Sequence, residues 1–344
     1  MIEFRKEITY SRVLDPKDNR EVVLTIETRY DPLTGETGTV YDSPLTPFRK
    51  IKLPKTDLTP WLQKSKEMGC PFCPGVVEKM TPLYPPQFLP EGRLRVGPVL
   101  IFPNPSALAP YCALAVLGEE HFLDLPDFTE DLLAQGITAC QVFLRRLRGY
   151  DGKLQFCSLN WNYMPPAGAS MLHPHLQLMA SYTPTNRQRA EERGSSSFYR
   201  KYRVPFWSQL VEEEEKRGER FLGWTGRVAW LGSFIPKGML LDAQAVFPDG
   251  VPLPDLDERE VRAFAQGLLR VFRYLAERNI VGFNLSIYSG MAPRVYRWAH
   301  ARIISRAAWP PMNNSDLNFP AVLHDEPTTA SAPEEVAREL KAYF

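Results

Sequence analysis

Histidine and cysteine are scarce in this chain of 344 residues, which has only 5 of each. No stretch approaches the roughly 20 consecutive apolar residues of a membrane-spanning helix, so we expect no membrane contact. The net charge is +1, so there is no excess of one sign that favours nucleic acid. An odd cysteine count and a charged N-terminus do not suit a disulfide-linked secreted domain. We therefore expect a cytoplasmic protein.

The few histidines and cysteines are concentrated in short motifs. His173 and His175 are one residue apart in HPHLQ, just after a run of small residues, 167–170. Cys70 and Cys73 form the motif CPFC. Alone, the histidine pair would most simply be two surface residues of a hairpin, but the cysteine motif favours a built site.

The chain contains an internal repeat. Segments 125–147 and 253–275 both open with Leu-Pro-Asp and then place apolar residues at helical spacing. This pattern predicts two amphipathic helices, with Asp127 and Asp255 as candidate N-caps. The corresponding apolar positions are Leu133, Ile137, Cys140 and Leu144 in the first segment and Val261, Ala265, Leu268 and Phe272 in the second.

Two apolar runs typical of strands precede each predicted helix, and two more follow it. We therefore predict an α+β fold made of two copies of one unit, with a mostly antiparallel sheet. Segment 158–181 aligns without a gap on 283–306, which matches Tyr163 with Tyr288, His175 with His300 and Gln177 with Arg302. The predicted organisation is an N-terminal half (1–181), an exposed connecting segment (182–222) and a C-terminal half (223–344). We expect the acidic run of that segment, 211–220, to be a solvated helix face.

The segment around HPHLQ predicts one reactive face. On a strand, His173, His175 and Gln177 share a face, while Leu176 packs the other way. Pro174 donates no ladder hydrogen bond, which favours an edge strand or a strand start. The small-residue loop before it could bring backbone amides close to an anion.

The cysteine motif predicts a metal site. Two thiolates at this spacing can ligate one zinc ion, and His121 and His173 are the candidates that complete a closed structural site. The remaining cysteines, Cys112, Cys140 and Cys157, lie in apolar runs and should be core residues.

With His173 engaged by metal, His175 is free to react. An imidazole held in line can attack phosphorus and form a covalent intermediate. Gln177, Ser170 and the loop amides could donate hydrogen bonds to the phosphoryl oxygens.

These motifs resemble the galactose-1-phosphate uridylyltransferase family, a two-copy branch of the histidine-triad superfamily. HPHLQ behind the loop AGAS is similar to the family's active-site motif, and CPFCPG (70–75), GEEHFLDL (118–125) and ETRYDPLTG (27–35) extend the resemblance to most of the chain. The resemblance implies that His175 is the nucleophile that becomes nucleotidylated. It also implies structural zinc, a possible homodimer and a role in galactose metabolism. The other implied sites are phosphate contacts at Asn162, Gly168, Ser170 and Gln177, a ribose-side asparagine at Asn104, and zinc ligands at Cys70, Cys73, His121 and His173.

The second copy departs from the family pattern. Where the family often has a His-x-His pair that helps to bind a second metal, this chain has Trp298 and His300. We therefore predict no second metal site and a second copy that serves as a scaffold; His324 should be a surface residue. The residues after Gly35 also differ from the family's, so the resemblance does not fix uridine as the base.

The leading functional hypothesis is a nucleotidyltransferase that works by ping-pong. It would move a nucleoside monophosphate from a nucleoside diphosphate sugar to a sugar 1-phosphate. The alternatives are a phosphorylase, in which inorganic phosphate accepts the nucleotide from a nucleoside diphosphate sugar or a dinucleotide, and a hydrolase. The resembled family often separates transfer from hydrolysis by glutamine or histidine at the position of Gln177, and glutamine favours transfer, because a second histidine suits proton delivery to water. A catalytically inactive nucleotide-binding protein is the remaining alternative, against which the intact His175 argues.

Overall fold

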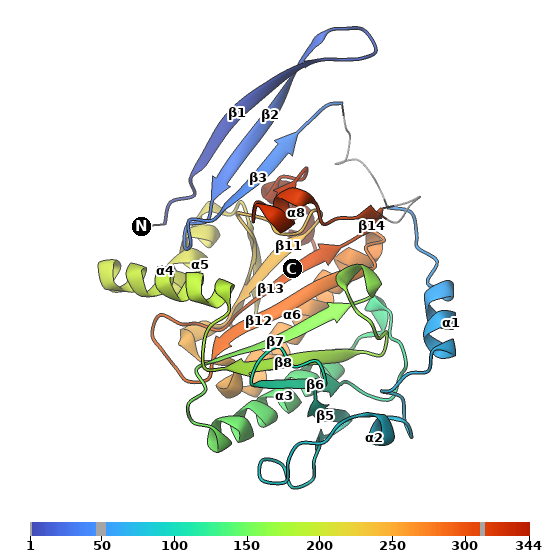
Figure 1. The fold of residues 1–344 in the computed structure, drawn as a ribbon. Helices are drawn as coiled ribbons and strands as arrows, with labels where there is room; N and C mark the ends of the chain where they lie inside the picture. The colour runs from blue at the N-terminus through green and yellow to red at the C-terminus, as the bar shows by residue number, and fades with distance from the viewer. Residues whose placement is uncertain (1, 46–52, 310–313) are drawn as a thin grey trace.

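The computed structural model describes residues 2–45, 53–309 and 314–344 (Figure 1). The helices are α1 (Thr59–Glu67), α2 (Val77–Met80), α3 (Glu130–Tyr150), α4 (Asn186–Tyr202), α5 (Phe206–Arg217), α6 (Glu258–Glu277), α7 (Phe319–Leu323) and α8 (Pro333–Lys341). The strands are β1 (Lys6–Leu14), β2 (Glu21–Tyr30), β3 (Thr37–Asp42), β4 (Leu94–Val96), β5 (Val99–Pro103), β6 (Tyr111–Val116), β7 (Phe156–Tyr163), β8 (His175–Ser181), β9 (Phe221–Thr225), β10 (Val228–Gly232), β11 (Asp242–Val246), β12 (Gly282–Gly290), β13 (His300–Arg306), β14 (Ala308–Trp309), β15 (Asn314–Ser315) and β16 (Thr328–Thr329).

One ten-stranded antiparallel sheet forms the centre of the molecule. Its strand order is β4-β5-β6-β8-β7-β12-β13-β11-β10-β9. The first five strands and the last five repeat the same arrangement on either side of the β7–β12 junction. The predicted α+β fold with a duplicated unit is therefore confirmed.

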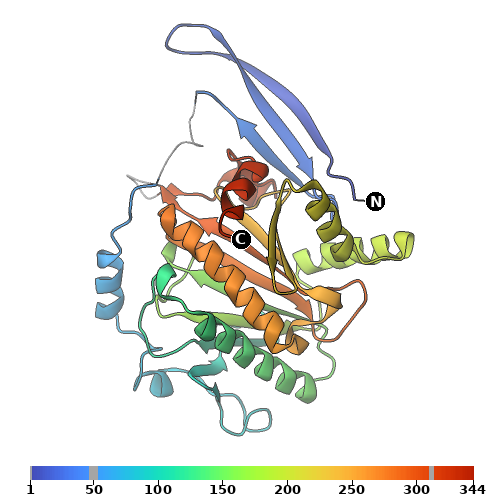
Figure 2. The same ribbon diagram turned by 180° about the vertical axis from the view of Figure 1, so that it is seen from behind.

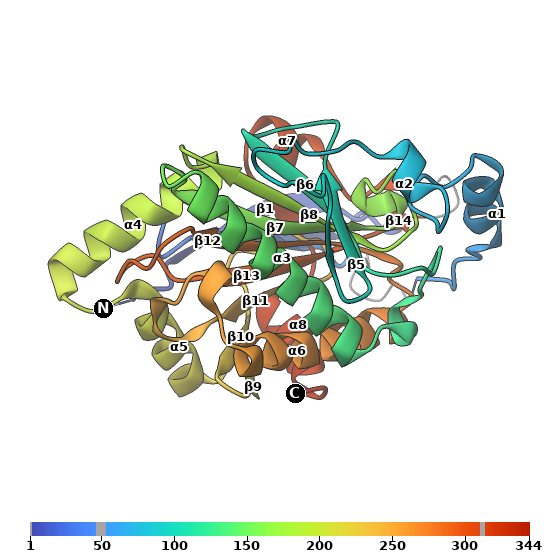
Figure 3. The ribbon, with the colours of Figure 1, turned by 90° about the horizontal axis from the view of Figure 1, so that it is seen from below.

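Helices α3 and α6 lie side by side on one face of this sheet (Figures 2 and 3). Their expected apolar positions are all buried in one core that spans both halves, and Cys112, Cys140 and Cys157 are buried as predicted. The predicted N-caps are wrong. The N-cap of α3 is Thr129, whose hydroxyl accepts from the amide of Leu132, and that of α6 is Asp257, whose carboxylate accepts from the amide of Glu260. The two Leu-Pro-Asp segments instead form short 3-10 turns ahead of each helix, so Asp127 and Asp255 precede the true caps.

The ungapped alignment of the two copies is wrong by one residue along β7. The structure pairs Asn160 with Gln177 in the first half and Ser286 with Arg302 in the second. Since Gln177 corresponds to Arg302, Asn160 corresponds to Ser286 and not to Leu285.

This shift changes the face on which the matched tyrosines lie, because a one-residue slip turns a side chain to the other side of a sheet. Tyr163 stacks on Phe283 in the core, with ring centroids 5.0 Å apart. Tyr288 lies on the opposite face, with its ring centroid 5.3 Å from that of His300.

The connecting segment forms α4 and α5 and is not an exposed linker. Glu191 and Trp207 are among its buried side chains, so this expectation is wrong. The acidic run is mostly exposed, as predicted, but Val211, Glu214 and Arg220 are buried. Glu214 and Arg220 form an ion pair with an N–O distance of 2.9 Å.

The N-terminal strands extend away from the main sheet (Figure 1). They form a separate sheet in the order β1-β2-β3-β16, which joins them to the C-terminal region. Arg29 is buried at its base and donates to both carboxylate oxygens of Glu334 in α8, at 2.9 Å each. Burial alone would raise the pKa of Glu334, but the hydrogen bonds from Arg29 and Arg220 lower it to about 2.

No helix in the described part of the chain is both long and apolar enough to cross a membrane.

The contact between α6 and the sheet yields a prediction about stability. A Cβ atom on Gly267 would lie 2.2 Å from the indole of Trp230, which is buried, so Gly267→Ala should destabilise the fold by about 1–3 kcal/mol. A Cβ atom on Gly149 in α3 would meet no neighbouring side chain or strand within 4 Å, so Gly149→Ala should raise stability by about 0.5–1 kcal/mol. Urea denaturation of both variants measures the difference, and equal stabilities would contradict this packing.

Candidate functional site

Strand β8 carries the two central residues of the predicted site. It begins at His175, directly after Pro174, whose carbonyl accepts from the amide of Leu117 at 3.0 Å. The proline therefore marks a strand start, while β8 itself lies between β6 and β7 and is not an edge. Leu176 packs toward Gly136 of α3, so His175 and Gln177 lie on the opposite face of the sheet, as predicted.

The four predicted zinc ligands come together in the structure. Cys70, Cys73, His121 and His173 each offer one ligand atom, and these atoms lie within 4.8 Å of one another. The Sγ atom of Cys73 is 3.3 Å from Nδ1 of His121, and that of Cys70 is 3.7 Å from Nδ1 of His173.

In both imidazoles, the nitrogen that faces away from the cysteines, Nε2, has a hydrogen-bond partner, as is typical of metal-binding histidines. Nε2 of His173 donates to the carbonyl of Gly118 at 2.9 Å, and Nε2 of His121 is 3.1 Å from the hydroxyl of Ser65. Since a carbonyl only accepts, Nε2 of His173 carries the proton and its Nδ1 presents a lone pair to the sulfur atoms. The pKa of Cys73 is raised to about 11, mainly by burial and secondarily by the neighbouring Cys70. The thiol is therefore protonated, and a metal ion must displace its proton to bind. Two thiols and two oriented imidazoles fit a structural zinc ion.

His175 is oriented by the backbone of the neighbouring histidine. Its Nδ1 donates to the carbonyl of His173 at 2.8 Å, and the residue is buried with the ring of Phe72 packed against it at 5.2 Å. Burial lowers the pKa of His175. The imidazole is therefore neutral with its proton on Nδ1, and Nε2 carries the lone pair that a nucleophile needs.

The loop between β7 and β8 holds its shape through its own amides. Those of Ala167, Gly168 and Ala169 donate to carbonyls of Met164 and Pro165, so they are engaged within the loop. Gly168 has φ +84°, a backbone conformation that favours glycine. Gly168 and Ser170 are exposed, which leaves both able to meet a ligand at the loop surface.

The predicted asparagines lie at different distances from β8. Asn162 is on β7, the strand next to β8, and lies on the same face as Asn160, which pairs with Gln177. Asn104 follows β5, two strands from β8, and its Oδ1 accepts from the amide of Ser106 at 2.9 Å. The structure therefore groups Asn162 with His175 and Gln177 and leaves Asn104 at the margin.

Several residues around the site have no clear signal in the sequence. Ser65 reaches His121 from α1 and belongs to no recognisable motif. Gly118, just after β6, opens the segment GEEHFLDL, but nothing in that segment indicates its contact with His173. Phe72 could have been noticed, because it stands inside the cysteine motif and must therefore lie near the metal ligands.

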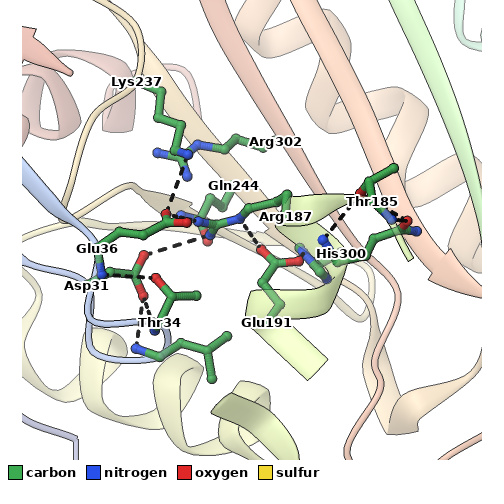
Figure 4. Close-up of polar contacts among 12 residues, drawn as sticks. Asp31, Thr34, Glu36, Thr185, Arg187, Glu191, Lys237, Gln244, His300 and Arg302 are labelled. Carbon is green, nitrogen blue, oxygen red and sulfur yellow. Dashed lines mark hydrogen bonds and ion pairs between the residues drawn. The ribbon is translucent and has the colours of Figure 1, made fainter. Parts of the chain in front are cut away.

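The counterpart of the site in the second half is closed (Figure 4). Nδ1 of His300 bonds to the carbonyl of Trp298 at 3.0 Å, as His175 bonds to His173, but its Nε2 lies 3.2 Å from a carboxylate oxygen of Glu191. The ring of Trp207 stacks on His300 at 3.9 Å. Both nitrogens of His300 therefore face a polar neighbour, and the ring is covered.

An ion-pair network holds the buried side chain of Glu191 in place. Arg187 is 2.6 Å from Glu191 and 2.6 Å from Glu36, which in turn is 3.5 Å from Lys237 (Figure 4). Burial alone would raise the pKa of Glu191, but His300 and Arg187 lower it to about 2. Glu191 of α4 thus lies against His300 in the second half.

The chain is similar in sequence to a protein of nearly the same length. No protein-family model matches the chain. A protein from Archaeoglobus fulgidus, described as uncharacterized, is 27% identical over 341 residues, which cover 99% of this chain and 98% of its own.

Solved structures resemble the chain over almost its whole length. An ADP-glucose phosphorylase from Arabidopsis thaliana with bound ADP-glucose has a TM-score of 0.69 and 15% identity, covering 92% of this chain and 98% of that chain. A uridylyltransferase has a TM-score of 0.67 and 20% identity, covering 92% and 97%. The expected resemblance to the galactose-1-phosphate uridylyltransferase family is confirmed in the fold.

The metal site generates a prediction about metal content. Cys73→Ser should lower the bound zinc from about one ion per chain and lower the melting temperature, because a closed site needs all four ligands. Metal analysis of the purified protein measures this. Cys140→Ala is the control, since it removes a thiol in α3 that is not among the four ligands, and it should keep the zinc. Full zinc content in Cys73→Ser would remove the assignment.

Proposed function

We propose that the protein is a nucleotidyltransferase that forms a covalent nucleotidyl intermediate on His175. The observation that carries this proposal is the hydrogen bond from Nδ1 of His175 to the carbonyl of His173, at 2.8 Å. This bond fixes the tautomer, so the lone pair lies on Nε2, on the face that also carries Gln177. The closed state of His300 in the second half supports one reacting histidine per chain.

The reaction has two balanced steps. In the first, Nε2 of His175 attacks the α-phosphorus of a nucleoside diphosphate sugar, a P–N bond forms, and the P–O bond to the sugar 1-phosphate breaks. In the second, a phosphate oxygen of the acceptor attacks the same phosphorus and the P–N bond breaks. The proton on Nδ1 stays on the bond to His173 throughout, so no separate base is needed to activate the nucleophile.

The surrounding residues have supporting roles in this proposal. Asn162, Ser170 and Gln177 are the donors for the phosphoryl oxygens, whose charge grows in the transition state. Gly168, whose amide is engaged with Pro165, contacts the phosphate at the loop surface. A zinc ion held by Cys70, Cys73, His121 and His173 would supply structural anchoring for the start of β8. Asn104 lies at the margin, where a ribose contact is the role that we assign.

The acceptor distinguishes two versions of this activity. A sugar 1-phosphate makes the protein a hexose-1-phosphate uridylyltransferase-like enzyme, and inorganic phosphate makes it a phosphorylase. The similar Arabidopsis phosphorylase with bound ADP-glucose supports a nucleoside diphosphate glucose as donor in either case.

The covalent step can be tested by the intact mass of the protein. Mixing with ADP-glucose or UDP-glucose and no acceptor should add one nucleoside monophosphate, and the added mass identifies the base. Adding phosphate or glucose 1-phosphate should then remove it, and the faster acceptor names the activity. The adduct should be absent from His175→Ala.

His300→Ala is the matched control for the loss of a buried histidine. It lies at the corresponding position of β13 and makes the same type of backbone bond, so it should still form the adduct even if its stability falls. An adduct in His175→Ala would move the nucleophile elsewhere. No mass gain in the unmodified protein with either donor would contradict the proposed function for these substrates.

A further inference from the structure

A side chain from the second half contacts the site of the first. Asn284 lies on β12, directly opposite Asn162 on β7. Its Nδ2 donates to Oδ1 of Asn162 at 2.8 Å and to the carbonyl of Ala167 at 2.8 Å. One residue therefore holds both a proposed phosphate ligand and the loop that carries Gly168 and Ser170.

The orientation of the Asn284 amide is fixed by its partners. Nη1 of Arg306 donates to Oδ1 of Asn284 at 3.0 Å, and Arg306 is itself held by Asp316 at 2.8 Å. A guanidinium only donates hydrogen bonds, so the oxygen of Asn284 must face it. The carbonyl of Ala167 only accepts, so the amide nitrogen must face the loop. These two independent constraints agree.

This orientation determines that of Asn162. Both hydrogens of the Asn284 amide are used, one on Ala167 and one on Asn162, so Asn162 must present its oxygen to β12. Its own amide nitrogen then points the other way, toward β8. The pairing of β7 with β8 ends at Asn160 and Gln177, and Asn162 and His175 each lie two residues beyond that pair on their own strands, on the same face of the sheet.

We propose that Asn284 is a positioning residue for nucleotidyl transfer, which turns the NH2 group of Asn162 toward the phosphoryl group that His175 attacks. Arg306 and Asp316 extend this support, so the second half stabilises the geometry of the site although its own histidine is closed. The inference rests on the proposed function, because Asn162 acts on a phosphoryl group only if one binds there.

A neighbouring pair provides a matched comparison. Ser286, also on β12, donates to Oδ1 of Asn160 at 2.8 Å. The amide of Asn160 is already engaged with Ser158 and with the carbonyl of Gln177. This cross-half bond has the same length and joins the same strands, but it does not orient a free donor.

The test replaces the donor while keeping the shape of the side chain. In Asn284→Asp, the carboxylate still accepts from Arg306 but cannot donate to Asn162, whose amide then loses its fixed orientation. We expect the rate of adduct formation with ADP-glucose or UDP-glucose, followed by quenched-flow mass spectrometry, to fall about 100-fold. Ser286→Ala should stay within about threefold of the unmodified protein.

A double-mutant cycle separates positioning from a general structural effect. If Asn284 acts through Asn162, then Asn284→Asp should slow an Asn162→Ala protein no further. Melting temperatures of the single variants monitor folding. An adduct rate in Asn284→Asp equal to that of the unmodified protein, or fully additive losses in the cycle, would overturn the proposal.

The affinity for AMP and UMP gives a second readout that needs no chemistry. Calorimetry should show binding of the preferred nucleotide weakened about tenfold by both Asn284→Asp and Asn162→Ala, with no further loss in the double variant. If the unmodified protein forms no adduct, the proposed function fails while this measurement still decides the role of Asn284. Unchanged affinity in Asn284→Asp would then contradict it.

Discussion

The hydrogen bond between Nδ1 of His175 and the carbonyl of His173 is the constraint on which the site depends. His173 is itself held, through Nε2 to Gly118 and through Nδ1 toward the two cysteines. His173, in the candidate metal site, lies just before β8, and His175, the proposed nucleophile, is the first residue of that strand. The two rings therefore have different partners. The ring of His173 faces the cysteines, while that of His175 uses Nδ1 for the backbone bond and presents Nε2.

The second half has the same fold as the first, but the histidine that corresponds to His175 is covered. His300 has the same backbone bond as His175, but Glu191 and Trp207 occupy the space above it. The ten-stranded sheet nevertheless runs unbroken through both halves, so side chains of β12 reach the first site across a single strand boundary. Under the proposed function, duplication thus provides one reacting centre and one neighbouring half that holds its geometry.

Much of this could be predicted from the sequence, because it depends on local spacing. The helical apolar pattern of 133–144 and 261–272 identified the duplicated unit, and alternation along HPHLQ placed His175 and Gln177 on one face. The four metal candidates followed from ligand chemistry. The sheet register could not be predicted, because a one-residue shift between the copies leaves no mark in the composition. The contact of Asn284 with Asn162 could not be predicted either, because the two residues are 122 positions apart in the chain. The burial of Glu191 was also hidden, since a charged helix is expected to be exposed until its partners Arg187 and His300 are known.

The most direct test of the account is the identity of the modified nitrogen. Phosphorus–nitrogen NMR of the isolated adduct, with histidine labelled by nitrogen-15, distinguishes the two ring positions. Because Nδ1 is bound to the carbonyl of His173, the account predicts that phosphorus is attached to Nε2 of His175. Attachment to Nδ1, or to any other side chain, would contradict it.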